Sequence, residues 1–208
     1  RTFSLIEMAM KGGWLMLVLL ILSIIAIYIF GNKWWMIRKA GKIDRNFMKD
    51  IRDMIHDGKI KSALALCQKY DSPIARLVEK GIERIGRPLP DIQAAVENMG
   101  NVEVARLEKN LPMLATISGG APMIGFLGTV TGMIRAFFEM ANAGNNIDIT
   151  LLSGGIYEAM VTTVGGLFVG IIAYFGYNFL TSQISNLVFK MESTTIEFID
   201  MLHEPAGR

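Results

Sequence analysis

The chain has 208 residues, a net charge of +2, 51% apolar residues and a mean hydropathy of +0.37. This apolar content is too high for an ordinary soluble domain of this size and favours a membrane protein. The single Cys67 excludes a disulfide within the chain and a cysteine-rich metal site, and the two histidines lie far apart, so we expect no metal and no cofactor. The small net charge gives no reason to invoke nucleic acid.

The first apolar run has no charged residue from Gly12 to Asn32. At 1.5 Å per residue it can cross a hydrocarbon core of roughly 30 Å, so we predict a membrane span here. The run is longer than the apolar part of a typical signal peptide and lacks a following A-x-A-like site. We therefore expect this span to be retained.

Basic residues after the first span set the expected orientation. Seven of them fall within about 20 residues of its end. They are Lys33, Arg38, Lys39, Lys42, Arg45, Lys49 and Arg52. This side should be cytoplasmic, which leaves the N-terminus periplasmic and the C-terminus cytoplasmic.

The segment after the first span has the pattern of amphipathic helices. Apolar residues recur at spacings of three and four at Ile43, Phe47, Ile51, Met54 and Ile55. Gly58 should end this helix, and Ser72 followed by Pro73 predicts the N-cap and first turn of a later one. From Asp91 a helical pattern runs without a clear stop into the second span, so we expect one continuous helix there.

Two further apolar runs predict a second and a third span. The second span contains Pro112, Pro122 and many glycines. Such helix breakers are tolerated where neighbouring helices cover the freed backbone groups. With no period-two alternation and no internal repeat, the fold class is all-α. The predicted boundaries are 1–13 for a periplasmic or interfacial segment, 14–35 for the first span, 36–109 for a cytoplasmic helical region, 110–138 for the second span, 139–148 for a periplasmic loop, 149–182 for the third span and 183–208 for a cytoplasmic C-terminal helix and tail.

Glu158 is the only acidic residue well inside an apolar run. A charge at mid-membrane costs on the order of 2.5 to 3.5 kcal/mol, so this carboxyl needs a water-filled cavity, a partner or protonation. Glu158 is therefore a candidate functional site. Alternatively, Glu158 lies higher and reaches the outer interface, or it pairs with Arg135 of a neighbouring chain.

Hydroxyl and glycine residues accompany this carboxyl. Thr129 and Thr131 lie in the second span, and Thr162 and Thr163 in the third. Neutral hydroxyls can line a hydrated path, although a membrane threonine commonly bonds only to its own i−4 carbonyl. Two GxxxG pairs predict close helix packing: Gly128 with Gly132, and Gly166 with Gly170. The motifs of common hydrolases are absent, so we expect no enzyme.

The runs APMIGFLGTVTGM at 121–133 and GIYEAMVTTVGGL at 155–167 resemble the MotA/TolQ/ExbB proton channel family, and most closely its ExbB and TolQ members. The three-span layout, with a large cytoplasmic segment after the first span, is that of the same subfamily. By this resemblance Glu158, Thr129 and Thr163 occupy the positions of pore-lining residues. Thr162 stands where alanine is common, which leaves open which of the paired threonines faces the pore.

The resemblance implies a homopentamer in the lipid bilayer of a bacterial inner membrane, with a central pore lined by the second and third spans. Two copies of a single-span ExbD- or TolR-like partner would sit in the pore and bring a proton-carrying aspartate. An ExbB-like subunit would use the proton motive force to drive outer-membrane active transport through a TonB-like protein. The alternatives are a TolQ-like subunit for envelope maintenance and a scaffold that conducts nothing. Independently, one carboxyl and a few hydroxyls cannot relay protons across about 30 Å, so a partner must complete the path.

Overall fold

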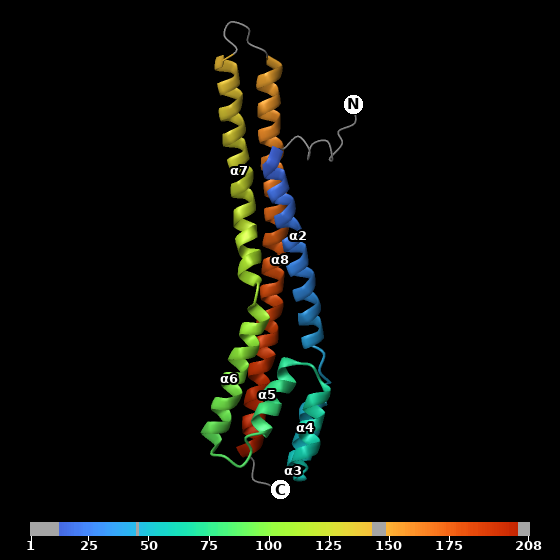
Figure 1. The fold of residues 1–208 in the computed structure, drawn as a ribbon. Coiled ribbons are helices and arrows are strands. Elements are labelled where there is room, and N and C mark those ends of the chain that lie inside the picture. Colours follow the sequence, from blue (N-terminus) through green and yellow to red (C-terminus); the bar gives the residue numbers. More distant parts are fainter. Residues whose placement is uncertain (1–12, 45, 143–148, 204–208) are drawn as a thin grey trace. The chain divides into compact units, whose positions relative to one another are not determined.

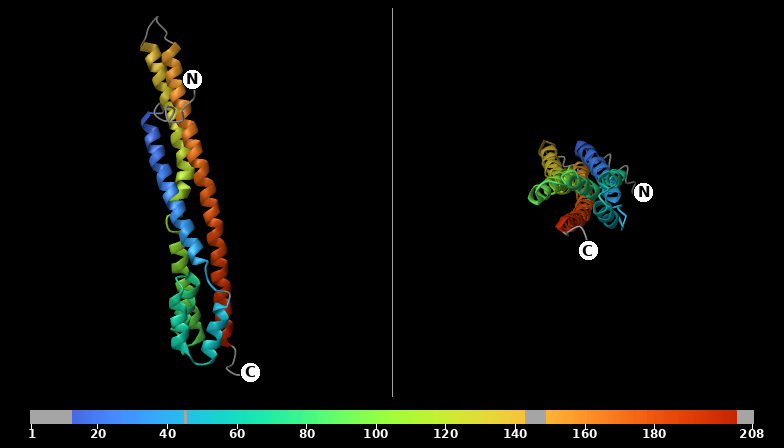
Figure 2. Two further views of the ribbon diagram at one scale, coloured as in Figure 1. Left: turned by 90° about the vertical axis from the view of Figure 1, so that its right-hand side faces the viewer. Right: turned by 90° about the horizontal axis from the view of Figure 1, so that it is seen from below.

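The computed structural model describes residues 13–44, 46–142 and 149–203. The parts of the predicted N-terminal segment, periplasmic loop and tail that fall at 1–12, 143–148 and 204–208 lie outside the described residues. The described ranges form seven helices and no strand, which confirms the all-α prediction (Figure 1, Figure 2). The helices α2 (Gly13–Ala40), α7 (Leu111–Asn142) and α8 (Ile149–His203) belong to three segments that are long and apolar enough to cross a membrane.

The chain forms two compact units. The first comprises Arg1–Gly31 and Asn110–Phe179, and the second comprises Asn32–Lys109 and Leu180–Arg208. Helices α2 and α8 therefore contribute residues to both units.

In the first unit, α7 and α8 approach each other through glycine. A methyl group built on Gly166 would lie 2.5 Å from the carbonyl oxygen of Ala121 and 2.8 Å from the Cα of Gly125. One built on Gly170 would lie 2.5 Å from the ring of Pro122. Only a hydrogen atom fits at these positions, so the glycines allow the two backbones to come into direct contact.

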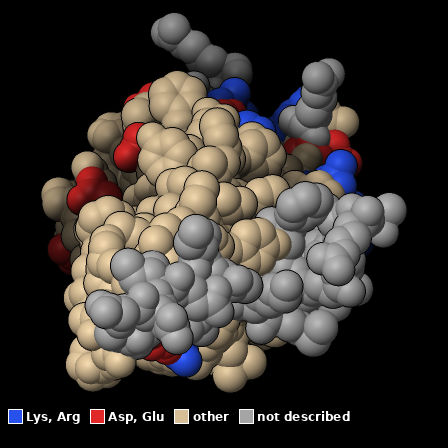
Figure 3. Space-filling model, turned by 90° about the horizontal axis from the view of Figure 1, so that it is seen from above, with Lys and Arg blue, Asp and Glu red and all other residues tan. Residues whose placement is uncertain are grey.

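Helix α2 lies against α8 in the same unit. The Met16 sulfur fits over Gly165, and Phe30 lies beside Gly176 and Phe179, with 6.3 Å between the two ring centroids. The outer surface of these helices is apolar, as Met123 (73% exposed) and Phe168 (67%) illustrate. In the view of Figure 3, most described atoms belong to uncharged residues. Such a surface suits contact with lipid.

The second unit is built around four short helices, which are α3 (Phe47–His56), α4 (Ile60–Lys69), α5 (Pro73–Ile82) and α6 (Leu89–Glu108). Each packs on the next along the chain. Helix α5 buries seven of its ten residues and is the centre of the unit. Its Gly81 contacts the ring of Phe198 from α8, which is itself fully buried.

Two predicted helix boundaries in the second unit are confirmed. Gly58 has φ of +71°, and its N–H donates to the carbonyl of Ile55 at 3.0 Å, so the chain leaves α3 there. Ser72 is extended and Pro73 is the first residue of α5. The predicted capping role of the Ser72 side chain is wrong, because its hydroxyl instead donates to the carbonyl of Ala40 at 2.9 Å.

The prediction of one continuous helix from Asp91 into the second span is wrong. Helix α6 ends at Glu108 and α7 begins at Leu111. Between them Asn110 has φ of +71°, a conformation that asparagine tolerates better than most residues. Pro112 has no N–H to donate, and its ring would clash with the Glu108 carbonyl in a continuous helix.

Buried polar groups in the second unit have partners. The ammonium of Lys33 donates to the carbonyls of Arg106 at 3.1 Å and Leu107 at 3.0 Å, which are left unbonded at the end of α6. Arg76 binds both carboxylate oxygens of buried Glu103, at 2.8 and 2.7 Å. This carboxylate raises the pKa of Arg76 above its ordinary value.

Candidate functional site

Two hydroxyls meet where α7 and α8 pack. Thr129 and Thr163 contact each other through their Oγ1 atoms. The Thr163 hydroxyl can donate to the carbonyl of Gly125 on α7 at 2.9 Å, and the carbonyl of Ala159 on its own helix is a second acceptor at 3.2 Å. The hydroxyl pair therefore lies between the helices and not on the outer surface.

Thr162 and Thr131 instead bond within their own helices, as a membrane threonine commonly does. Thr162 is 2% exposed, donates to the carbonyl of Glu158 at 3.0 Å and lies against Gly128. Thr131 donates to the carbonyl of Leu127 at 2.9 Å. Thr162 and Thr163 thus have different surroundings, and Thr163 is the one that bonds across to α7.

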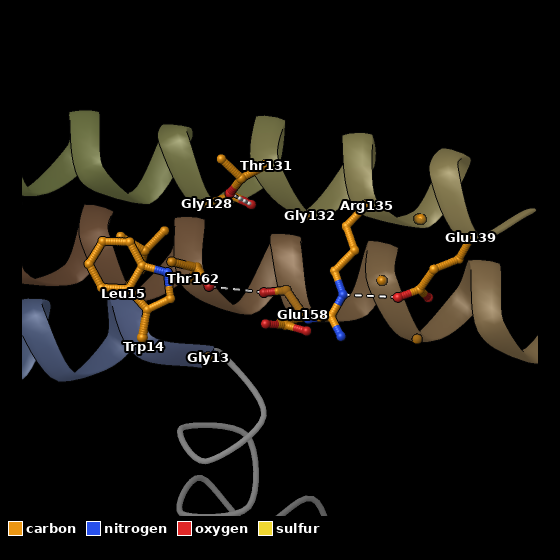
Figure 4. A pocket seen from close by; sticks show the side chains of 13 residues that line it. Gly13, Trp14, Leu15, Gly128, Thr131, Gly132, Arg135, Glu139, Glu158 and Thr162 are labelled. Atoms are coloured by element: carbon orange, nitrogen blue, oxygen red, sulfur yellow. Dashed lines mark hydrogen bonds and ion pairs between the residues drawn. The ribbon is translucent and has the colours of Figure 1, made fainter.

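Glu158 lines a cavity of about 370 Å³ formed by α2, α7 and α8 (Figure 4). The Glu158 residue is half-buried. The walls also hold two more charged side chains, Arg135 and Glu139, and the hydroxyl residues Thr131 and Thr162. The carboxyl therefore shares this cavity with both charged side chains of α7.

Arg135 lies between the two acids of this cavity. Its Nε donates to Oε1 of Glu139 at 2.9 Å. Figure 4 shows the guanidinium between the Glu139 and Glu158 side chains. From the sequence, Arg135 is a candidate partner of Glu158 from a neighbouring chain; in the structure the two side chains line one cavity of the same chain, and the hydrogen bond of Arg135 goes to Glu139.

The first residue of α2 borders Glu158. Gly13 has φ of +67°, and a methyl group built on it would lie 2.5 Å from Oε1 of Glu158. Any larger residue would have to displace this carboxyl. Helix α2 thus contributes to the surroundings of a side chain carried by α8.

The family of this chain is established by comparison with known proteins. A model of the MotA/TolQ/ExbB proton channel family matches residues 69–193, more than half of the chain. The chain belongs to this family. The resemblance of the two glycine-rich runs is thereby confirmed, and Thr129, Glu158 and Thr163 all lie within the matched residues.

Relatives with both ExbB and TolQ names are found. The chain is 29% identical over 185 residues to an ExbB-like biopolymer transport protein of Synechocystis sp., covering 88% of this chain and 72% of that protein. It is 28% identical over 193 residues to an ExbB homolog of Methanothermobacter thermautotrophicus, covering 91% and 67%. It is also 34% identical over 106 residues to the Tol-Pal system protein TolQ of Haemophilus influenzae, covering 51% and 46%.

In this member of the proton channel family the candidate residues fall into two groups. Glu158 and Thr162 line the cavity, whereas Thr129 and Thr163 meet at the helix contact and are not among its lining residues. The glycines Gly128, Gly132, Gly166 and Gly170 all face the partner helix, and a methyl on Gly132 would lie 2.9 Å from Cβ of Ala159.

Sequence reasoning named Arg135 only as a partner from a neighbouring chain, and it did not assign Glu139 or Gly13 to the site. The first two are four residues apart at the end of the second apolar run, a spacing that places them on one helix face and could have drawn attention. Gly13 lies outside the family match and nothing in the sequence marks it. Among the described residues no group of histidine, cysteine and acidic side chains could hold a metal ion.

Proposed function

We propose that this chain is the ExbB-like subunit of a proton-driven motor in a bacterial inner membrane. It would form a homopentamer and work with a single-span, ExbD-like partner, coupling the proton motive force to outer-membrane active transport through a TonB-like protein. Glu158, Thr129, Thr163 and Thr162 are its proton-path and pore-lining residues, and Thr163 is the one of the paired threonines that bonds across to α7. The N-terminus would be periplasmic and the C-terminus cytoplasmic.

The observation that carries this proposal is the placement of Glu158. Its carboxyl opens into a polar cavity, although the helices around it are apolar on their outer faces. Carboxyl groups and hydroxyls exchange protons with water and with each other, so this cavity suits proton transfer. The family match, to channel proteins for protons, supports the same chemistry.

The polar groups of the first unit support the need for a partner. Among the described residues of this unit, Glu158 supplies one carboxyl in the cavity, whereas the Glu139 carboxyl is already bonded to Arg135. The only further groups proposed for the path are the two hydroxyls that meet between the helices. A path of roughly 30 Å requires more groups than these. A single-span protein carrying a further acid would supply them.

Proton flux into liposomes tests the proposal. The chain is reconstituted with each candidate single-span partner, and flux is followed with an internal pH dye after an applied gradient. Glu158→Gln and Thr163→Ala should each abolish most of the flux. Thr116→Ala is the matched control, because Thr116 is exposed and donates only to the carbonyl of Pro112 on its own helix. Equal flux from the Glu158→Gln variant and the unaltered protein would refute the site.

Native mass spectrometry separates the alternatives. A pentamer that gains two copies of an ExbD-like partner supports the ExbB-like proposal, and one that gains a TolR-like partner supports the TolQ-like alternative. A monomer or dimer that ignores every partner and passes no protons would favour a scaffold. The Haemophilus influenzae relative keeps the TolQ-like alternative in view.

A further inference from the structure

All charged residues in the described part of the first unit line one cavity. They are Arg135, Glu139 and Glu158, and every other described residue of that unit is uncharged. Charges are costly among membrane helices unless water or a partner reaches them. Their gathering in a single cavity therefore makes this the polar centre of the unit.

The three charges do not cancel. Arg135 is bonded to Glu139, and Glu158 adds a second negative charge, so the set carries one net negative charge when both acids are ionised. A guanidinium stays protonated at every pH a protein experiences, whereas a carboxyl can gain or lose a proton. The Glu158 carboxyl thus lies in one cavity with a fixed positive charge.

Resting on the proposed function, we infer that Arg135 is the specificity-determining residue of this cavity and excludes metal cations from Glu158. Without it, the cavity would be lined by two carboxylates and no cation, and carboxylate oxygens are ligands that hard metal cations prefer. With it, an approaching sodium ion meets a positive charge that cannot be removed. A proton still reaches Glu158, because it is handed along hydrogen bonds and need not occupy the cavity as an ion.

Glu139 has a positioning role in this arrangement. It lies one helical turn from Arg135 on α7 and accepts a hydrogen bond from Nε, which holds the long side chain over the cavity. The other edges of the guanidinium remain directed toward the Glu158 side (Figure 4).

Ion selectivity tests the inference. Liposomes that hold the chain and its single-span partner are assayed for proton uptake and for uptake of radioactive sodium under the same gradient. Arg135→Gln should raise the ratio of sodium to proton flux by at least about tenfold, since a cleft of one charge sign concentrates its counter-ions by that order. Arg135→Lys should keep the original ratio. An unchanged ratio in the Arg135→Gln variant overturns the inference.

A binding measurement distinguishes failure of the inference about Arg135 from failure of the proposed function. The detergent-solubilised chain is titrated with Mn²⁺, and free Mn²⁺ is read by electron paramagnetic resonance. We expect saturable binding by Arg135→Gln, none by the unaltered chain, and loss of the new binding when Glu158→Gln is added. If the unaltered liposomes pass no protons, the proposed function fails, while this titration still decides the charge argument. Equal Mn²⁺ binding by the unaltered and Arg135→Gln chains refutes the inference.

Discussion

Replacing Gly166 by alanine tests the contact between α7 and α8. The new methyl would lie 2.5 Å from the carbonyl oxygen of Ala121 and 2.8 Å from the Cα of Gly125. Both neighbours are backbone atoms, so no side-chain rotation can make room. Ordinary contact begins at 3.4 Å, so the two helices must separate locally by about 0.9 Å.

The expected cost follows from two opposing effects. Overpacking a well-packed contact costs typically about 1–3 kcal/mol. Alanine in place of glycine within a helix returns roughly 0.5–1 kcal/mol, because less backbone freedom is lost on folding. The middle of the first range exceeds the middle of the second, so we expect a net loss of about 1 kcal/mol. The same displacement would pull the Thr129 and Thr163 hydroxyls apart, so proton flux should fall as well.

Gly119→Ala is the control, since a methyl group on Gly119 meets nothing within 4 Å. It gains the same helix preference without the clash. Thermal unfolding in detergent, followed by circular dichroism, should place Gly166→Ala below the unaltered chain and Gly119→Ala at or above it. A midpoint for Gly166→Ala that equals that of Gly119→Ala would refute the close contact.

Three further predictions concern the second unit. Glu103→Ala should destabilise it by about 2–3 kcal/mol, at or below the lower end for breaking a buried pair, because it leaves the guanidinium of Arg76, whose side chain is 25% exposed, with the exposed Asp71 as its remaining partner. Joint replacement of both residues by methionine should restore most of this loss in chemical unfolding, and equal damage from the single and double changes would contradict the argument. The hydrogen bond from Lys39 lowers the pKa of Asp71 in the folded chain. The stability that ionised Asp71 contributes is therefore complete above its pKa of about 4 in the unfolded chain, and it is lost as the pH falls through the lower pKa of the folded chain. Asp71→Asn should therefore reduce the acid-side fall of the unfolding midpoint, and identical pH profiles would count against this. Burial raises the pKa of Cys67 to about 12, so iodoacetamide at neutral pH should label this thiol only after the chain unfolds. Mass spectrometry would detect the label, and rapid labelling of the folded chain would contradict the burial of Cys67.

Helix types and several helix ends could be predicted from the sequence because they depend on local chemistry. Long apolar runs specify α2, α7 and α8, and Gly58 and Pro73 mark ends through their own backbone preferences. The hydrophobic pattern did not predict the break before α7, although Pro112 lies at that point of the sequence. The apolar pattern continues across it, and the pattern alone does not register the missing N–H of proline.

The candidate site was predicted in part for a related reason. Glu158 stands out because it interrupts an apolar run, and such an interruption can be recognised from the sequence alone. Arg135 and Glu139 lie at the end of a run, where charges are ordinary, so their role depends on how α7 lies beside α8. The involvement of Gly13 depends on the placement of a third helix and has no signature in the sequence.

The pairing of charges in the cavity bears on the choice between a motor subunit and a scaffold. Arg135 and Glu139 satisfy each other within one helix, so the stability of the unit does not require a third charge. Glu158 on α8 is that third charge, and an ionised carboxyl among membrane helices costs on the order of 2.5–3.5 kcal/mol that leucine or alanine would avoid. A scaffold gains nothing from this cost. A proton carrier, in contrast, needs a carboxyl that is not locked in a permanent ion pair and can still take up and release a proton. The placement of Glu158 beside a guanidinium already bonded to another acid therefore favours the proton-carrying function.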